Sequence, residues 1–354
     1  MKKILLFTLL TVLNTIAYSQ TSFLSIGDVQ KLSLHGFVQA NYDYTNNAGK
    51  ETNDFNFKHV VLIADASLTE RLSFRLMADM ASPQHLYLLL QEYYAQYTFA
   101  PWLKVRMGQF KTPYTIENVM PPTLIGALNT NSSVCYMAGV VSDPLYGLMA
   151  GRDQGIMLSG EVLHGSDGHA LMSYSVGLFN GAGVNQRDNN RSKDLVAMLN
   201  IIPIKEVQLT ASCIIGRGTA RNDSPFSGIT SGEEYRRNRW SAGVKAHYER
   251  ITFRGEWMGG VDGNTPMCGG YAELWIRTLP KLDVVLDIDY LNRNSTLDKE
   301  QQKMVPQATQ TTNYTIGLQY WIYRNCRIAT QYVHTASPSA PTSHLWATQV
   351  QMAF

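Results

Sequence analysis

The sequence lacks any apolar run long enough to cross a membrane as a helix, and charged residues make up only 16% of its 354 residues. A helical span needs about 20 consecutive apolar residues, so a bundle of membrane-spanning helices is excluded. Basic and acidic residues are nearly equal in number, at 30 and 28. A nucleic-acid-binding domain is expected to carry a basic excess, so we expect no nucleic-acid partner.

Cysteine is also scarce. The four cysteines are Cys135, Cys213, Cys268 and Cys326, which are far apart and form no CxxC motif. This spacing argues against a zinc site. An exported protein could form disulfides, but we expect most of these residues to be small apolar members of a wall or loop.

Catalytic motifs are missing as well. The eight histidines are scattered, without an HExxH motif or a Ser, His and Asp order that suggests a triad. The sequence therefore predicts no enzyme, no metal and no cofactor. A catalytic barrel would require His, Ser and Asp side chains to meet inside the fold.

The N-terminus has the pattern of a secretion signal. Lys2 and Lys3 precede an apolar run from residue 4 to 16, and Ala17 and Ser19 offer small residues for cleavage before Gln20. This pattern predicts a cleaved signal peptide at residues 1–19. Without its two lysines, the mature chain has 28 basic and 28 acidic residues.

Apolar and polar residues alternate along the remainder of the chain. Near the C-terminus, for example, Leu286 and Ile288 alternate with Asp287 and Asp289. Successive side chains of a strand point to opposite faces, so each segment has an apolar and a mainly polar face. We expect Leu286 to face lipid and Asp287 to face the interior.

Sixteen such segments can be counted. They span residues 32–44, 56–68, 71–80, 86–98, 102–110, 152–162, 169–178, 193–201, 206–216, 238–248, 251–259, 268–278, 282–291, 311–322, 326–334 and 343–354. Odd-numbered segments are followed by long polar stretches such as 45–55 and 111–151, and even-numbered ones by tight links such as Glu249-Arg250. Short periplasmic turns and long external loops are typical of an outer-membrane barrel.

These features predict an all-β fold. We expect a 16-stranded antiparallel transmembrane up-and-down β-barrel over residues 32–354, preceded by a short periplasmic segment at residues 20–31. A barrel of this size is too wide for side chains to fill, so the polar face lines water and the apolar face meets outer-membrane lipid. Aromatic residues cluster near the predicted strand ends, as interfacial girdles do.

The sequence VRMGQFKTPY at residues 105–114 resembles the VRxGQFKTPFG signature of the phosphate-selective porin O/P family. Residues 151–160, 177–185 and 311–318 resemble the same family in the same order. The resemblance implies a 16-stranded, commonly trimeric barrel whose third external loop folds inward to narrow the pore. Known members favour anions through inward Arg and Lys. Because the mature chain has no basic excess, no phosphate-binding residues are transferred to it.

Residues 111–151 form the longest predicted loop and are rich in apolar residues, as in Leu124-Ile125 and Val140-Val141. This composition favours burial over disorder, so we expect the loop to fold into the lumen or against a neighbouring subunit. Inward folding would place Lys104, Arg106 and Lys111 beside a constriction, and Arg75 also falls on an inward position. These four cations are the predicted selectivity residues.

The predicted function is therefore passive diffusion of small hydrophilic solutes across the bacterial outer membrane, with a mild preference for anions such as phosphate. We expect a homotrimer. The acidic face formed by Asp283, Asp287 and Asp289 would bind a cation or, as we favour, balance the basic residues. The alternative function is a plugged structural or adhesion barrel without channel activity.

Overall fold

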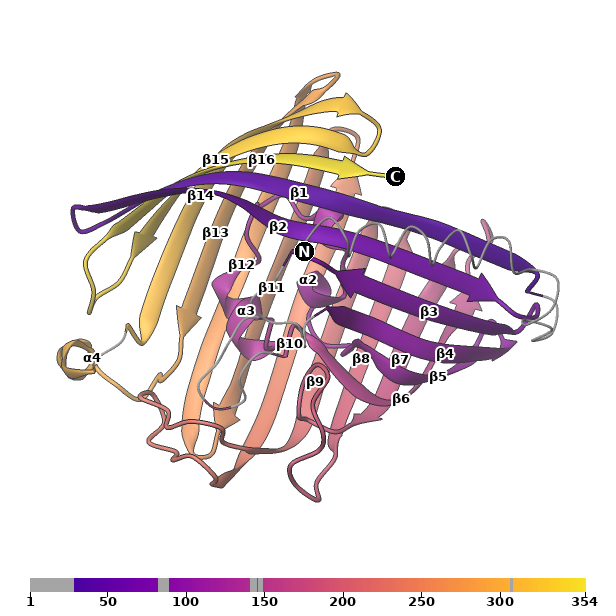
Figure 1. Cartoon of the computed structure of the whole chain (residues 1–354), viewed down its shortest axis with the longest axis horizontal. Helices are drawn as coiled ribbons and strands as arrows, with labels where there is room; N and C mark the ends of the chain where they lie inside the picture. Colours follow the sequence, from indigo (N-terminus) through magenta and orange to yellow (C-terminus); the bar gives the residue numbers. More distant parts are fainter. Residues whose placement is uncertain (1–28, 82–88, 141–144, 146–148, 306–307) are drawn as a thin grey trace, which may run out of the picture.

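The computed structural model describes residues 29–81, 89–140, 145, 149–305 and 308–354. In these ranges the chain forms sixteen antiparallel strands that close into one barrel (Figure 1). The predicted fold class is confirmed. The predicted signal peptide at 1–19 and most of the segment at 20–31 lie outside the described residues.

Each of the sixteen predicted segments corresponds to one strand. The strands are β1 (Lys31–Asn47), β2 (Lys50–Ser67), β3 (Leu72–Asp79), β4 (Leu90–Ala100), β5 (Leu103–Lys111), β6 (Arg152–His164), β7 (Ala170–Phe179), β8 (Asp194–Ile204), β9 (Val207–Thr219), β10 (Glu234–Tyr248), β11 (Ile251–Asp262), β12 (Thr265–Leu279), β13 (Leu282–Asn292), β14 (Gln310–Tyr323), β15 (Cys326–Ala336) and β16 (Ser343–Ala353). Consecutive strands pair throughout, and β1 closes the barrel against β16 with Phe37 opposite Ala353. A closed barrel has no free strand edge, so its backbone N–H and C=O groups need no hydrogen-bond partner from lipid.

The stretch 45–55 is not a long loop, and this expectation was wrong. β1 and β2 continue through it in register, from Thr45 opposite Thr52 to Asn47 opposite Lys50. Only Ala48 and Gly49 remain as the turn, with φ of 53° and 86°. Two residues with positive φ make the turn type that suits a twisted hairpin. This part of the hairpin has no alternating apolar face, and the strands continue through it by backbone pairing alone.

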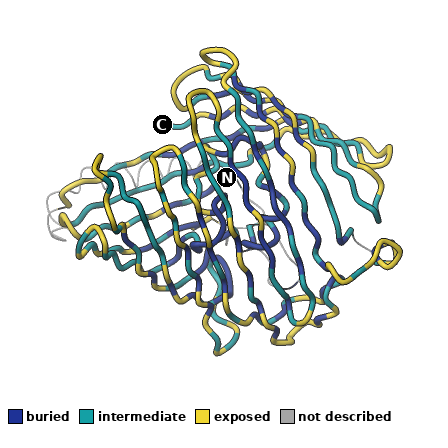
Figure 2. The backbone as a smooth tube through the Cα atoms, turned by 180° about the vertical axis from the view of Figure 1, so that it is seen from behind, coloured by how far each residue is buried: buried dark blue, intermediate teal, exposed yellow. Residues whose placement is uncertain are grey.

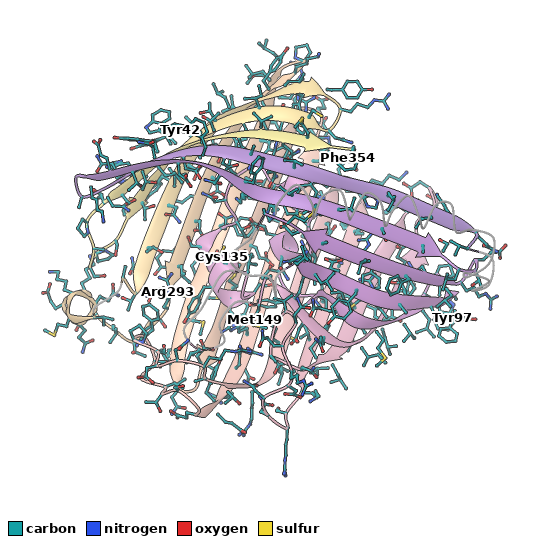
Figure 3. The ribbon with its side chains drawn as sticks, in the orientation of Figure 1. Tyr42, Tyr97, Cys135, Met149, Arg293 and Phe354 are labelled. Carbon is teal, nitrogen blue, oxygen red and sulfur yellow. The ribbon has the colours of Figure 1, made fainter. Side chains whose placement is uncertain are left out.

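The faces of the strands follow the predicted alternation. Leu286 is 39% exposed on the outside, whereas Asp287 is 7% exposed on the inside. Figure 2 shows this alternation of exposed and buried residues along the strands. Tyr42 and Tyr97 lie at the periphery of the barrel, and Cys135 lies within it (Figure 3). All four cysteines are free thiols.

The long connection at residues 112–151 is here called loop 3, and its described residues fold into the barrel. It contains α2 (Ile116–Val119), the 3-10 helix η2 (Pro122–Leu124) and α3 (Ser132–Met137). Both α-helices appear inside the ring of strands in Figure 1. Val134 and Met137 of α3 are fully buried in a cluster with inward side chains such as Phe110, Met258 and Leu291. The predicted inward-folded third loop is thus confirmed. A further short helix, α4 (Lys299–Met304), lies in the connection between β13 and β14.

Candidate pore and selectivity site

Loop 3 is fixed to one side of the lumen by carboxylates of the barrel wall. Glu256 on β11 accepts the backbone N–H of Ile116, at 2.9 and 3.0 Å from its two oxygens. Glu273 on β12 accepts the N–H of Ala127 at 2.7 Å. Each of these carboxylates is less than 5% exposed. Burial of a carboxylate is tolerated when hydrogen bonds replace its hydration, so the two side chains position the loop backbone.

The anchoring continues along β13. Asp289 accepts the N–H groups of Ser132 and Ser133, at 2.7 and 3.1 Å, together with the Ser133 hydroxyl at 2.8 Å. These residues begin helix α3, where free N–H groups and the helix dipole favour a negative partner. Asp289 therefore orients α3 inside the lumen.

Polar side chains of β15 hold the middle of loop 3. Gln331 accepts the N–H of Leu128 at 2.8 Å and donates to the carbonyl of Gly126 at 2.6 Å. Arg327 donates to the carbonyl of Ile125 at 2.8 Å. Loop 3 thus covers much of the inner face of the wall from β11 to β15, and open space remains between the loop and other parts of the wall.

The predicted acidic face has a different role from the one expected. Asp289 anchors loop 3, and Asp283 forms an ion pair with Arg277 of β12. Asp287 is buried, and its Oδ2 has no hydrogen-bond partner in the described part of the chain. None of the three pairs with the basic residues near β5, because loop 3 separates the two sides of the lumen.

Two cavities lie between loop 3 and the wall formed by β1 to β8, and a third, of about 500 Å³, lies between Met120 and Leu124 of loop 3 and residues of β8 to β14 such as Lys245 and Trp275. Of the first two, the outer cavity has a volume of about 230 Å³, and the inner cavity, on the side of the short turns, has a volume of about 550 Å³. Five residues line both cavities: Phe37, Met77, Lys111, Pro122 and Arg152. Residues that line both cavities mark the level where the cavities meet. We therefore take the ring formed by these five residues as the constriction.

Four cations surround the inner cavity. Arg75 donates to both oxygens of Asp65, at 2.7 and 2.8 Å, and Arg152 contacts Glu92 at 3.0 Å. Arg106 donates to the amide oxygen of Gln96 at 2.7 and 3.0 Å. The positive groups that line this cavity are Arg75, Arg106, Lys111 and Arg152, and among its described lining residues Glu92 is the single carboxylate.

Two of these basic residues lack a carboxylate partner among the described residues. No carboxylate of the described residues lies within 4 Å of Arg106 or Lys111 in an ion pair. The Arg106 guanidinium is 4.2 Å from the centre of the Tyr94 ring, a favourable cation–π distance. Lys111 donates to the carbonyl of Met120 at 2.6 Å, which brings β5 and loop 3 together.

The predicted selectivity residues are thus brought together in part. Arg75, Arg106 and Lys111 line the inner cavity, whereas Lys104 lines neither cavity. Arg152 was missed by the sequence reasoning. Met157 faces inward, so strict alternation along β6 would place Arg152 on the outer face. Arg152 instead lines both cavities, at the end of β6 where it lies opposite Lys111 and the chain leaves loop 3. A basic residue at each end of the longest loop is the signal that could have identified it.

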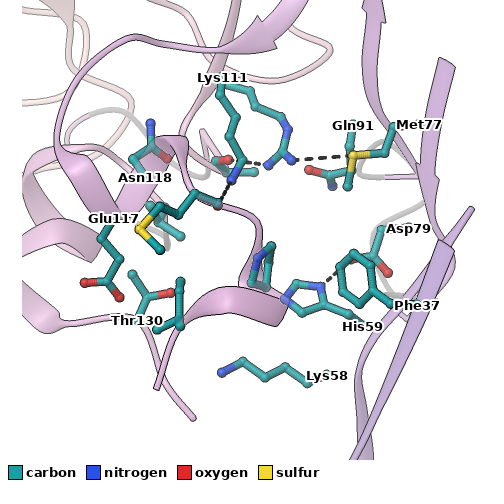
Figure 4. Close-up of a pocket in the computed structure, with 16 residues that line it drawn as sticks. Phe37, Lys58, His59, Met77, Asp79, Gln91, Lys111, Glu117, Asn118 and Thr130 are labelled. Carbon is teal, nitrogen blue, oxygen red and sulfur yellow. Dashed lines mark hydrogen bonds and ion pairs between the residues drawn. The ribbon is translucent and has the colours of Figure 1, made fainter. Parts of the chain in front are cut away.

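The outer cavity contains a second group of charges, shown in Figure 4. His59 and Asp79 are 2.6 Å apart. Lys58 contacts the carbonyl of Leu128 and donates to the side chain of Asn129 at 2.9 Å. On the facing side, burial raises the pKa of Glu117 in loop 3 to about 7, against its two hydrogen bonds from Asn131.

A comparison with known families matches residues 31–225 to the family described as phosphate-selective porin O and P. The match covers more than half of the chain. The chain belongs to this porin family. The matched residues contain β1 to β9 and loop 3, which include every strand that lines the two cavities.

Solved structures support the fold. OprB of Pseudomonas putida has a TM-score of 0.69 at 10% identity, covering 96% of this chain and 97% of that chain. An anion-selective porin of Comamonas acidovorans has a TM-score of 0.64 at 11% identity, with 92% and 99% covered. The outer membrane channel DcaP of Acinetobacter baumannii scores 0.65 at 10% identity, with 92% and 97% covered. No curated protein matches the sequence.

Family and fold together establish a porin of the bacterial outer membrane, and they indicate a channel rather than an enzyme. Across the described ranges, no helix is long and apolar enough to span a bilayer. In the same ranges, no three His, Cys, Asp or Glu side chains converge as ligands of a metal ion.

Proposed function

We propose that this porin passes small hydrophilic solutes with a mild preference for anions, and that Arg75, Arg106, Lys111 and Arg152 set this preference. The observation that carries the proposal is the charge around the inner cavity, where four cations face one carboxylate among the described lining residues. Charged side chains at a narrow, poorly screened passage determine which ions enter it. The near balance of 30 basic and 28 acidic residues over the whole sequence matters less than this local excess.

The reversal potential of single channels in a potassium chloride gradient tests the proposal. We expect the parent protein to show a potential on the anion-selective side. Replacing Arg106 by Glu together with Lys111 by Glu puts carboxylates in place of the two basic residues that lack an acidic partner, and should move the potential toward cation selectivity. Lys104→Glu is the matched control, because Lys104 is on the same strand face as Arg106 but lines neither cavity.

Two results would contradict the proposal. The first is an unchanged reversal potential in the double variant, and the second is an equal shift in the Lys104→Glu control. A correctly folded, heat-modifiable barrel that forms no channels would instead support the plugged-barrel alternative.

We also propose that the protein assembles as a homotrimer surrounded by outer-membrane lipid. Support comes from OmpT of Vibrio cholerae, whose structure resembles this one with a TM-score of 0.63 at 9% identity. That OmpT structure is described as a trimer form. The exposed apolar outer face, with Leu158, Leu178 and Ile316 as members, suits lipid or subunit contact. Migration at three times the monomer mass in mild detergent would support the trimer, and a monomer under all non-denaturing conditions would contradict it.

A further inference from the structure

The inner cavity is lined by apolar as well as cationic side chains. On the barrel wall, Ile63, Met77, Met157 and Met198 line it from β2, β3, β6 and β8. These are inward positions, where a water-filled lumen ordinarily favours polar residues. Loop 3 covers the opposite side of the lumen, so apolar residues on β2 to β8 border the space through which solute passes.

Loop 3 presents apolar groups from the facing side of the same cavity. Val119, Pro121 and Pro122 line it, and Val119 is 39% exposed although it lies within the lumen. An apolar side chain exposed to a confined aqueous space gains from contact with an apolar part of a passing solute. The cavity therefore has apolar surface on both of its sides.

Positive charge lies beside this apolar surface. The Arg106 guanidinium is stacked at 4.2 Å from the Tyr94 ring, and both residues line the cavity. The Nε and Nη2 groups of Arg106 donate to Gln96, so its Nη1 group is the donor that a solute carboxylate would meet in a charge-assisted hydrogen bond. A solute with a carboxylate at one end and a short hydrocarbon chain at the other would satisfy both features at once. The volume of about 550 Å³ falls in the range of small-molecule binding sites.

We propose that the inner cavity is a binding site for amphipathic organic anions, in the class of short straight-chain monocarboxylates, and that it prefers them to inorganic phosphate. The proposal deepens the anion preference proposed above and rests on it. The carboxylate contacts Arg106 and Lys111, and the hydrocarbon chain contacts Val119 and Ile63 across the cavity. Phosphate, which has no apolar part, gains only the electrostatic contact.

Block of the chloride current through single channels tests the site. Acetate, butanoate and hexanoate are added in turn at the same ionic strength, with phosphate and the neutral hexanamide as comparisons. We expect the half-blocking concentration to fall about twofold for each added CH₂, a partial form of the gain from full burial of that group. Phosphate should block no better than acetate, and hexanamide should block less than hexanoate.

A pair of variants isolates the apolar contact. Val119→Thr exchanges a methyl for a hydroxyl group at nearly constant shape, and Ile63→Thr makes the same exchange while also removing the terminal methyl group. Together they should flatten the dependence of the block on chain length. Val305→Thr is the matched control, because the same exchange in the external connection after α4 does not touch the cavity. Should the double variant fail to fold, Val119→Thr alone, on the loop surface, serves the same purpose.

Each outcome has a defined meaning. A chain-length dependence in the parent and the control that is lost in the variant supports the site. An equal block by all three carboxylates, or a dependence that survives in the variant, overturns it. If the parent channel shows no anion preference in a chloride gradient, the proposed function itself fails, and that result is separate from the block experiment.

Discussion

Lys111 links the charge of the pore to the position of loop 3. Its ammonium group lines both cavities and also donates to the Met120 carbonyl. Arg152 has a similar double role, since it contacts Glu92 on β4 and the Met77 sulfur on β3. A substitution of Lys111 or Arg152 that removes its charge therefore also removes a contact that shapes the passage.

Strand faces can be tested residue by residue at β6. Ser159 lines the inner cavity, whereas its neighbour Leu158 is 44% exposed on the outer wall. In a background without the four native cysteines, we expect Ser159→Cys to react with a small membrane-impermeant thiol reagent and Leu158→Cys to remain unlabelled. The opposite labelling pattern would mean that β6 is shifted by one residue.

This position is a better probe than Asp287, where the sequence also predicted contact with lumen water. Asp287 does face the interior, but loop 3 leaves it only 7% exposed. Alternation predicts the face on which a side chain lies. It does not predict whether another segment covers that face, because the covering contacts come from residues more than a hundred positions away.

At the scale of elements, loop 3 behaves as an inner layer attached mainly through carboxylates and amides of β11 to β15. We expect Glu256→Ala to weaken this attachment, because the Ile116 N–H and the Ser241 hydroxyl both lose their carboxylate partner. Leaving buried donors unpaired costs about 1–3 kcal/mol. The expected result is greater open-channel noise and a lower temperature of barrel unfolding in detergent.

Glu300→Ala is the control for this change. Glu300 is exposed on α4 and its ion pair with Lys303 lies outside the lumen, and such pairs contribute little to stability. Channel noise that rises equally in both variants, or in neither, would show that Glu256 does not hold the loop.

The stability of loop 3 against the barrel wall should also depend on pH, through the protonation of Glu117. Burial raises the pKa of this carboxyl group from its usual value of 4.5 to about 7. A raised pKa means that the folded state binds the proton more tightly, so its stabilising contribution is full below pH 4.5 and is lost as pH rises through 7. Arg254 and Glu273 also act on this group, in opposite directions.

We therefore expect less open-channel noise at pH 4.5 than at pH 8. Glu117→Gln, which stays neutral and can still accept a hydrogen bond from Asn131, should remove most of this difference. An unaltered pH dependence in Glu117→Gln would assign the effect to other groups.

The strands themselves could be predicted from the sequence more fully than the interior. Alternation is a local property, so all sixteen strands were located, and the apolar composition of residues 111–151 predicted that this segment is buried. The extension of β1 and β2 through residues 45–55 was missed because that part of the hairpin has no apolar face. The wall carboxylates Glu256, Glu273 and Asp289 could not be recognised as anchors, since their partners are backbone groups of a distant loop.

At the scale of the whole molecule, the barrel depends on pairing between the two ends of the chain. Phe354 donates its N–H to the Gly36 carbonyl at 3.0 Å and accepts the Gly36 N–H at 3.1 Å. Its side chain is 72% exposed on the outer face, on the same face as Met352 and Trp346. The final residue is thus both the last pair of the closing ladder and an outward aromatic group.

We expect deletion of Phe354 to lower the amount of assembled barrel strongly while export to the periplasm continues. Phe354→Tyr keeps an aromatic ring and should assemble normally. Heat-modifiable migration in gels and cell fractionation measure the two steps separately. Normal levels of assembled protein after the deletion would show that the terminal residue is dispensable for assembly.

The concentration of loop 3 anchors on β11 to β15 has a consequence for how the protein can change. Most of the anchoring side chains are inward residues of β11 to β15, although Lys58 on β2 and Lys111 on β5 also contact the loop. Other inward residues of β2 to β8 border the two cavities without holding the loop. A library of random variants should therefore separate by strand, with defects in protein yield mapping to the first group and altered permeability at normal yield mapping to the second. New solute preferences can then arise by substitution of those inward residues of β2 to β8 that do not contact loop 3, without endangering assembly.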